Sequence, residues 1–192
     1  MKKLLLLFLS IAILLPACRD DDVNDNLSVL QYDGDNVSSP VFEQGTSVAA
    51  AFFPASFVAS RSGSQIQDFE FFLRDIPART IVRIESNGPN DVPESILYEL
   101  DVTTNVQGNS WNRIEFDNSA NFIDVPSDGV WLTVEVRHDN DGERSIGCDA
   151  GNPVNPNGDW VYSDIDNQWR TLRDRTGNQV NINWNIRANL AN

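Results

Sequence analysis

Hydrophobic and polar residues alternate along this chain in the manner of half-buried β-strands. In the clearest stretch, residues 181–190, every second residue is apolar: Ile182, Trp184, Ile186, Ala188 and Leu190. Residues 130–138 repeat the pattern, with Val130, Leu132, Val134 and Val136 on one face and Trp131, Thr133, Glu135 and Arg137 on the other. Successive side chains of a strand point to opposite faces of its sheet, so each stretch predicts a strand that buries one face and exposes the other.

Shorter segments of the same kind are separated by turn-forming stretches. We expect strands over residues 47–53, 67–74, 80–85, 96–103, 112–116 and 159–163, with turns such as SNGPNDVP, PSDG and DNDG between strands. No window after residue 17 keeps a helical period for ten residues, so the helices of a parallel α/β sheet are not predicted. The pattern predicts an all-β fold, namely an antiparallel two-sheet β-sandwich, jelly-roll-like, with about eight or nine strands.

The first 18 residues have the layout of an export signal. Lys2 and Lys3 precede an apolar run over residues 4–15, which is shorter than the ~20 residues that span a bilayer. The segment Leu-Pro-Ala-Cys at residues 15–18 resembles the lipobox of bacterial lipoproteins, in which cleavage precedes a cysteine that carries a diacylglycerol. We expect residues 1–17 to be a lipoprotein signal peptide and Cys18 to be lipidated. An ordinary signal peptide with an incidental cysteine is the alternative.

Acidic residues follow this cysteine directly. Asp20, Asp21 and Asp22 lie in a segment too polar to form a core, so residues 18–39 are expected to be a flexible tether and residues 40–192 the β-sandwich domain. An acidic cluster at this position resembles the export signal of surface lipoproteins in Bacteroidota-type bacteria. That resemblance implies an outer-membrane location facing the exterior, and a plain solvated spacer is the simpler interpretation.

Charge narrows the range of partners. The chain has 14 basic and 28 acidic residues, and loss of Lys2 and Lys3 with the signal peptide leaves a net charge of −16. Such a protein is repelled by nucleic-acid phosphates and by anionic membrane surfaces, so nucleic acid is not an expected partner. Attachment to the outer membrane then depends on the lipid anchor. Cys148 is left without a disulfide partner in this chain.

The C-terminal residues resemble one group of modules in particular. Jelly-roll β-sandwich modules in secreted and surface proteins of Bacteroidota-type bacteria end with a Gly-x-Trp hairpin, a second Trp and an Asn-Trp-x-Ile-Arg-Ala segment. The matching residues here are Gly158, Trp160, Trp169, Asn183, Trp184, Ile186, Arg187 and Ala188. The segment FEFFLRDIPARTIVRIES looks like an earlier strand pair of these modules, so the resemblance covers residues 40–190. It implies an adhesive or ligand-binding accessory without catalytic activity.

Four side chains are expected to contact a ligand. Trp131 lies on the polar face of its strand beside Glu135 and Arg137, and an exposed indole can stack on the apolar face of a sugar. Arg187 lies among asparagines on another polar face and could donate to hydroxyls or carboxylates, with pairing to a neighbouring acid as the alternative. Core positions are expected for the tryptophans Trp160, Trp169 and Trp184.

An acidic turn provides the expected metal site. In HDNDGE, residues 138–143, Asp139, Asp141 and Glu143 place oxygen ligands around a glycine, which suits calcium as a structural cofactor. The turn is not an EF-hand, because Arg137 and Cys148 would occupy its first and last ligand positions. Residues 33–35 and 164–167 are further acidic turns. Turn formation alone is the alternative explanation for all of them.

Catalytic motifs are absent or incomplete. His138 is the only histidine, and neither His-Glu-x-x-His nor Gly-x-Ser-x-Gly occurs. Glu99 and Asp101 resemble the opening of the acidic signature of jelly-roll glucanases, without the second glutamate that retaining hydrolysis needs. Cys148 is expected to be a buried thiol. We therefore expect a non-enzymatic surface module that binds a glycan, a peptide or a partner protein. The alternatives are a structural or assembly subunit of an outer-membrane complex and, remotely, a jelly-roll glycoside hydrolase.

Overall fold

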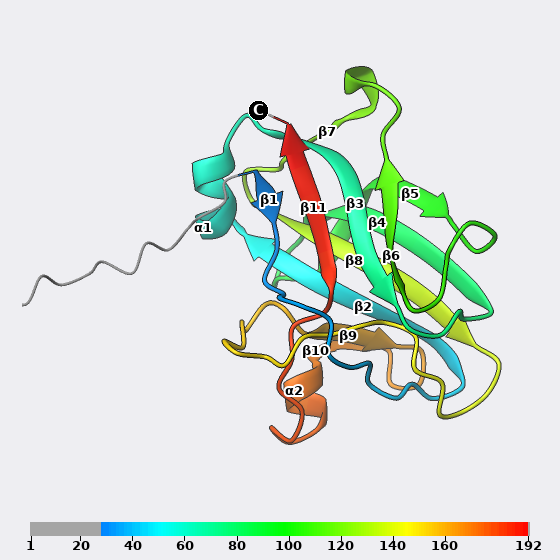
Figure 1. Cartoon of the computed structure of the whole chain (residues 1–192). Coiled ribbons are helices and arrows are strands. Elements are labelled where there is room, and N and C mark those ends of the chain that lie inside the picture. The colour runs from blue at the N-terminus through cyan, green and yellow to red at the C-terminus, as the bar shows by residue number, and fades with distance from the viewer. Residues whose placement is uncertain (1–27, 192) are drawn as a thin grey trace, which may run out of the picture.

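A computed structural model describes residues 28–191, which form a two-layer β-sandwich (Figure 1). One layer is a five-stranded sheet in the order β1–β11–β3–β6, with β7 paired to β3. The other is a six-stranded sheet in the order β10–β9–β2–β8–β4–β5. All strand pairs are antiparallel, and the chain crosses repeatedly between the two sheets, as in a jelly roll. The predicted fold class is confirmed.

The five-stranded sheet contains β1 (Val29–Leu30), β3 (Gln65–Leu73), β6 (Ser110–Glu115), β7 (Ile123–Asp124) and β11 (Ile186–Ala191). The six-stranded sheet contains β2 (Gly45–Pro54), β4 (Arg79–Asn87), β5 (Pro93–Asp101), β8 (Gly129–His138), β9 (Trp160–Ser163) and β10 (Gln168–Thr171). Two short helices, α1 (Ala55–Val58) and α2 (Leu172–Arg175), and 3₁₀ turns at Ala59–Arg61 and Ser119–Asn121 complete the structure. Among the described helices, none has the length and apolar character needed to cross a membrane.

Alternation along the long strands places the hydrophobic core between the two sheets. The inward residues of β8 are fully buried, as predicted: Val130, Leu132, Val134 and Val136. They belong to one cluster with Phe69 and Phe71 of β3 and with Trp184, which is also buried as predicted. Burying a side chain of this size contributes about 1.5–3 kcal/mol, so the facing strands hold the sheets together.

The sandwich begins earlier than the composition predicts. Residues 18–39 are expected to be a tether, but Val29 and Leu30 pair with β11, and Leu30 has no exposed surface. Asp33 is also buried, because Arg187 rather than solvent compensates its charge. The domain boundary predicted at residue 40 is therefore wrong. The predicted signal peptide at residues 1–17, the lipidated Cys18 and the acidic residues up to 27 lie outside the described residues.

The alternating segment at residues 181–190 is a strand only in its second half. β11 begins at Ile186, and before it Asn183 and Asn185 are fully buried, although the alternation predicts an exposed polar face. The Nδ2 group of Asn183 donates to Asp149 at 2.9 Å, and that of Asn185 donates to Asp33 at 2.8 Å. These amides can be buried because protein groups replace water as their hydrogen-bond partners.

Removing residues 28–39 should strongly destabilise the protein. A chain that starts at residue 40 lacks Leu30 and leaves Arg187 and Asn185 without Asp33. Losing a buried apolar side chain and a buried charge partner should lower the free energy of unfolding by about 3 kcal/mol or more. Urea denaturation, followed by tryptophan fluorescence, compares this chain with one that starts at residue 28. If the two chains unfold at the same urea concentration, residues 28–39 do not stabilise the domain and its boundary lies at residue 40.

Candidate functional site

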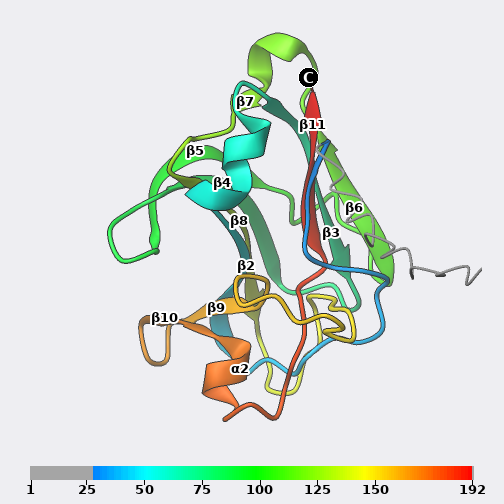
Figure 2. The ribbon, with the colours of Figure 1, turned by 90° about the vertical axis from the view of Figure 1, so that its left-hand side faces the viewer.

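The outer face of the six-stranded sheet is concave (Figure 2). The ring centroids of Trp131 on β8 and Trp169 on β10 are 5.5 Å apart. Three strand spacings separate β8 from β10, which is about 14 Å in a flat sheet. The sheet therefore curls toward this face and the two side chains lean together. A concave face can surround a ligand that a flat face would only touch.

Aromatic side chains fill the half of the concave face that lies over β2, β9 and β10. Phe52 stacks on Trp131 with ring centroids 4.4 Å apart, and Trp160 meets Trp131 edge-on at 5.4 Å. Tyr162 and Trp169 continue this cluster toward the sheet edge. Trp160, Tyr162 and Trp169 are partly exposed. Their rings are the aromatic surface that a bound molecule can reach.

Trp131 is not the exposed platform that the sequence predicts. It points outward but has no exposed surface, because Phe52, Trp160 and Trp169 pack around it. Its indole Nε1 donates to Asn87 Oδ1 at 3.0 Å, so its polar atom is also satisfied. Trp131 is the buried centre of the aromatic cluster. Trp160 and Trp169, expected to be core residues, form the accessible part.

Charged side chains gather on the other half of the concave face, over β4, β5 and β8. Arg83 donates through Nε to Glu99 and through Nη1 to Glu135 Oε2, the latter at 2.9 Å. Glu85 accepts a 2.8 Å hydrogen bond from the Thr133 hydroxyl. Carboxylates and guanidinium groups can each form paired hydrogen bonds. This half of the face can therefore bind a ligand with neighbouring hydroxyls.

Partial burial raises the pKa of Glu85 above its usual value. Desolvation is the largest cause, and the negative charges of Glu99 and Glu135 add to it. The hydrogen bond from Thr133 and the charge of Arg83 act in the opposite direction. A further hydrogen-bond donor at Glu85 would therefore favour its ionised form.

Two of the other predicted ligand residues share the strand of Trp131. Glu135 lies on the concave face, where it forms an ion pair with Arg83. Arg137 is farther along β8, exposed, with its guanidinium 3.5 Å from Asp139. The structure thus places Glu135 within the charged cluster and Arg137 at its margin.

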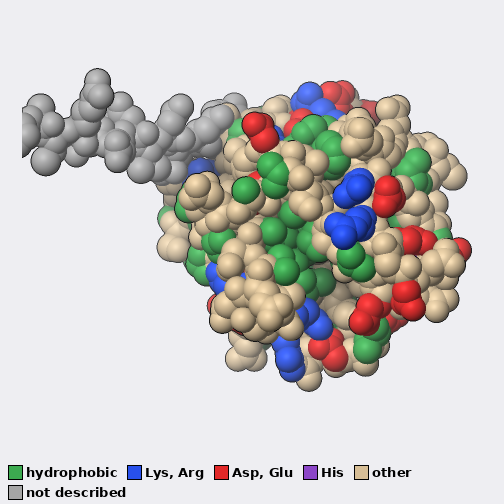
Figure 3. All heavy atoms as spheres, turned by 60° about the horizontal axis from the view of Figure 1, so that its bottom comes forward, with side chains coloured by type: hydrophobic (Ala, Val, Ile, Leu, Met, Phe, Trp, Pro, Cys, Tyr) green, Lys and Arg blue, Asp and Glu red, His purple; other side chains and the backbone are tan. Residues whose placement is uncertain are grey.

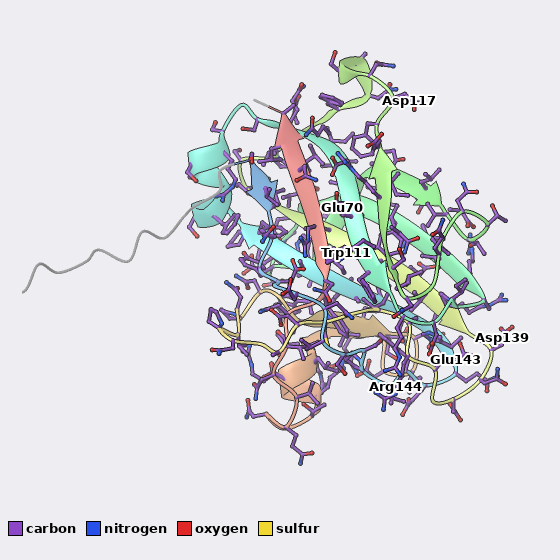
Figure 4. The ribbon with its side chains drawn as sticks, in the orientation of Figure 1. Glu70, Trp111, Asp117, Asp139, Glu143 and Arg144 are labelled. Carbon is purple, nitrogen blue, oxygen red and sulfur yellow. The ribbon has the colours of Figure 1, made fainter. Side chains whose placement is uncertain are left out.

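Arg187 belongs to a different surface. It lies on the outer face of the five-stranded sheet, where its Nη2 donates to Asp33 at 2.6 Å. Its guanidinium also stacks on the ring of Trp111 at 3.8 Å from the centroid, and Figure 4 labels Trp111 on this face. Arg187 thus forms an ion pair with Asp33, which is the alternative that the sequence analysis gave for it.

The acidic turn after β8 does not gather its carboxylates into a cation site. Asp141 accepts a 2.7 Å hydrogen bond from the backbone N–H of Gln44, and Glu143 accepts one from Asn140 at 3.1 Å. Figure 4 places Asp139 and Glu143 on this loop. Within residues 28–191, no three acidic, cysteine or histidine side chains lie together in a way that could hold a metal ion. These hydrogen bonds fit the turn-forming role given above as the alternative, and calcium binding stays a prediction.

Cys148 is a buried thiol, as expected. It is 1 % exposed, and burial raises its pKa to about 12, so it is protonated at neutral pH. His138 is buried too, with its Nε2 2.9 Å from the hydroxyl of Ser145. Nothing in this arrangement activates the sulfur as a nucleophile.

Arg83, Glu85 and Thr133 are site residues that the sequence analysis missed. Alternation marks them only as outward-facing positions, which every half-buried strand has. The informative signal is the cross-strand register, which places Arg83 opposite Thr133 and Glu85 opposite Trp131. That register depends on pairing β4 with β8, two strands far apart in the sequence.

Comparison with known proteins reveals a similarity of fold. No protein-family model matches the chain, and no curated protein matches it. Two structures of Cwp84 are similar, at TM-scores of 0.57 and 0.54 and 13% identity, over 84% and 85% of this chain. One is described as a clostridial cysteine protease after propeptide cleavage, the other as the cysteine protease and lectin-like domains of a surface layer associated protein of Clostridium difficile. This chain covers only 39% and 37% of theirs.

Replacing Glu85 with glutamine should stabilise the protein at neutral pH. Because folding raises the pKa of Glu85, keeping this group ionised costs folding free energy at any pH above that raised pKa. The Glu85→Gln variant should melt at a higher temperature at neutral pH. Its advantage should shrink as the pH falls toward the usual pKa of glutamate, where the wild-type side chain becomes protonated in the folded state.

Differential scanning calorimetry over a pH series measures this difference. Glu94→Gln, at an exposed position of β5, is the matched control and should show no such pH dependence. A Glu85→Gln variant that is less stable than the wild type at neutral pH would mean that Arg83 stabilises the ionised form more than burial opposes it.

Proposed function

We propose that this protein is a lipid-anchored, non-catalytic surface module whose concave face binds a glycan. One observation carries the proposal: the partly exposed rings of Trp160 and Trp169 share this face with the carboxylates around Arg83. Aromatic rings stack on the apolar faces of sugars, and planar charged groups bond to neighbouring hydroxyls. A sugar presents both an apolar face and a rim of hydroxyls, so it matches both halves.

The anchor and the location rest on the sequence. The lipobox-like residues 15–18 and the acidic residues that follow support a lipoprotein at the outer membrane, facing the exterior. The similarity to a surface layer associated protein with a lectin-like domain is compatible with a surface role for a sandwich of this fold. At 13% identity, it adds nothing about the ligand.

The carboxylates of β5 are engaged in ion pairs, which does not fit the acidic signature of a jelly-roll glucanase. Glu99 is paired with Arg83, and Asp101 is paired with Arg79 at 3.0 Å. Hydrogen bonds from Thr103 and Arg79 lower the pKa of Asp101 to about 2. The general acid of a glycosidase needs a raised pKa, and Asp101 has the opposite.

A subunit of an outer-membrane complex is the second candidate function, and β5 is the observation that favours it. β5 is the last strand of the six-stranded sheet, and it exposes Ile96, Leu97 and Leu100. An edge strand with exposed apolar side chains can pair with a strand of another chain. Stable co-purification with one outer-membrane protein, together with indifference to glycans, would favour this role.

A glycan array probed with the chain from residue 28 onward tests the glycan proposal. Trp169→Ala should weaken binding of any glycan that the array identifies by about tenfold, because a stacking contact contributes roughly 1–1.5 kcal/mol. Trp111→Ala is the matched control, since Trp111 is exposed on the opposite sheet. Trp131→Ala is not a suitable test of binding. Removing this buried side chain should lower the free energy of unfolding by about 3–5 kcal/mol, so a loss of binding could come from unfolding.

Binding should be the same in calcium and in EDTA, since the concave face contains no converging set of metal ligands among the described residues. A protein that binds no glycan, or that loses binding equally with Trp111→Ala, would refute the role given to the concave face.

A further inference from the structure

A second candidate site lies at the base of the sandwich. It is a cavity of about 420 Å³ between the segment at residues 38–41 and the chain from α2 to residue 182. Its walls include Val41, Leu172, Val180 and Ile182, with Cys148 beside them. Figure 3 shows hydrophobic side chains gathered at the base, with basic side chains on either side of them.

This cavity is separate from the concave face. A neighbouring hollow of about 250 Å³ shares Val41 and Leu172 with it and is also lined by Val161. On β9, Val161 points inward, whereas Trp160 and Tyr162 on either side of it point to the concave face. The two surfaces therefore lie on opposite sides of the same strand.

Arg144 gives the cavity its charge. It is the arginine that lines the larger cavity, and its Nη1 donates to the carbonyl of Ser39 at 3.0 Å, which holds the guanidinium in place. No carboxylate within residues 28–191 forms an ion pair with it. The chain has twice as many acidic as basic residues. An arginine left unpaired beside an apolar wall is therefore free to bind an anion.

Two other polar groups of the wall are already engaged. The hydroxyl of Ser39 donates to the carbonyl of Ile146 at 2.6 Å. The hydroxyl of Thr176 donates to the carbonyl of Leu172 at 2.9 Å. Arg144 is thus the charged donor available to a ligand, and the rest of the wall offers mainly apolar contacts.

We propose that this cavity binds a small amphipathic monocarboxylate. The apolar body of the ligand, aliphatic or aromatic, would fill the space between Val41, Leu172 and Ile182, and its carboxylate would bond to Arg144. The volume lies within the range of about 300–1,000 Å³ that small-molecule sites occupy. A neutral ligand of the same shape would keep the apolar contacts and lose the charge-assisted bond.

Displacement of a fluorescent probe tests this site in the purified protein. The probe is 1-anilinonaphthalene-8-sulfonate, an apolar anion, and the competitors are octanoate and octanamide, which differ only in the head group. Octanoate should displace the probe at a lower concentration than octanamide. Arg144→Gln should weaken octanoate by about tenfold, the size of a charge-assisted hydrogen bond, and leave octanamide unchanged.

Two further variants test whether an effect on binding comes from the charge of Arg144, from the position of the ligand in this cavity, or from a loss of folding. Arg79→Gln removes the same charge from an exposed arginine outside the cavity and should change neither competitor. Val41→Trp, at an exposed position of the wall, should weaken both competitors by filling the space, and it keeps the test valid if Arg144→Gln fails to fold. Equal affinity for octanoate and octanamide, no saturable displacement, or an unchanged octanoate affinity in Arg144→Gln would overturn the proposal.

Discussion

The closure of the sandwich depends on one buried carboxylate, that of Asp149. Its Oδ1 accepts hydrogen bonds from the backbone N–H groups of Gly151 and Asn183, both at 2.7 Å. Its Oδ2 accepts from the Asn183 amide at 2.9 Å and from the backbone N–H of Gly34 at 3.1 Å. Four donors can hold a carboxylate in the interior without a cation beside it. Three distant parts of the chain, the first segment, the loop before β9 and the last segment, meet at this group.

Several residues near the C-terminal end of the chain lie around this contact. A side chain at Gly158 would place its Cβ 2.5 Å from Asn183 Oδ1, so glycine is required there. The indole of Trp184 donates to the carbonyl of Trp160 at 2.9 Å. The Gly-x-Trp and Asn-Trp residues of this chain thus join its last segment to the hairpin that begins at β9. These residues are structural for that reason, and they say little about what the surface binds.

Sequence patterns predicted β2, β3, β4 and β8 well because each of these strands buries at least one whole face. They missed β1, β7 and β10, which have two to four residues and carry no measurable period. They also misplaced Trp131 and Asn183, for one common reason. Whether an outward residue is covered depends on what packs above it, such as Trp169 over Trp131. That contact is set by sheet curvature and by pairing between distant segments, which local alternation does not encode.

The position of β1 has a consequence for how the domain would stand on a membrane. β1 and the end of β11 lie at one end of the sandwich, and α2 and the base lie at the other (Figure 1). If Cys18 carries a lipid, as we propose, the anchored part of the chain enters the sandwich at this first end. The apolar cavity would then lie at the end of the domain farther from the point of attachment. The concave face lies between the two ends, on the side of the six-stranded sheet, so attachment at the first end would leave both candidate sites uncovered by the point of attachment.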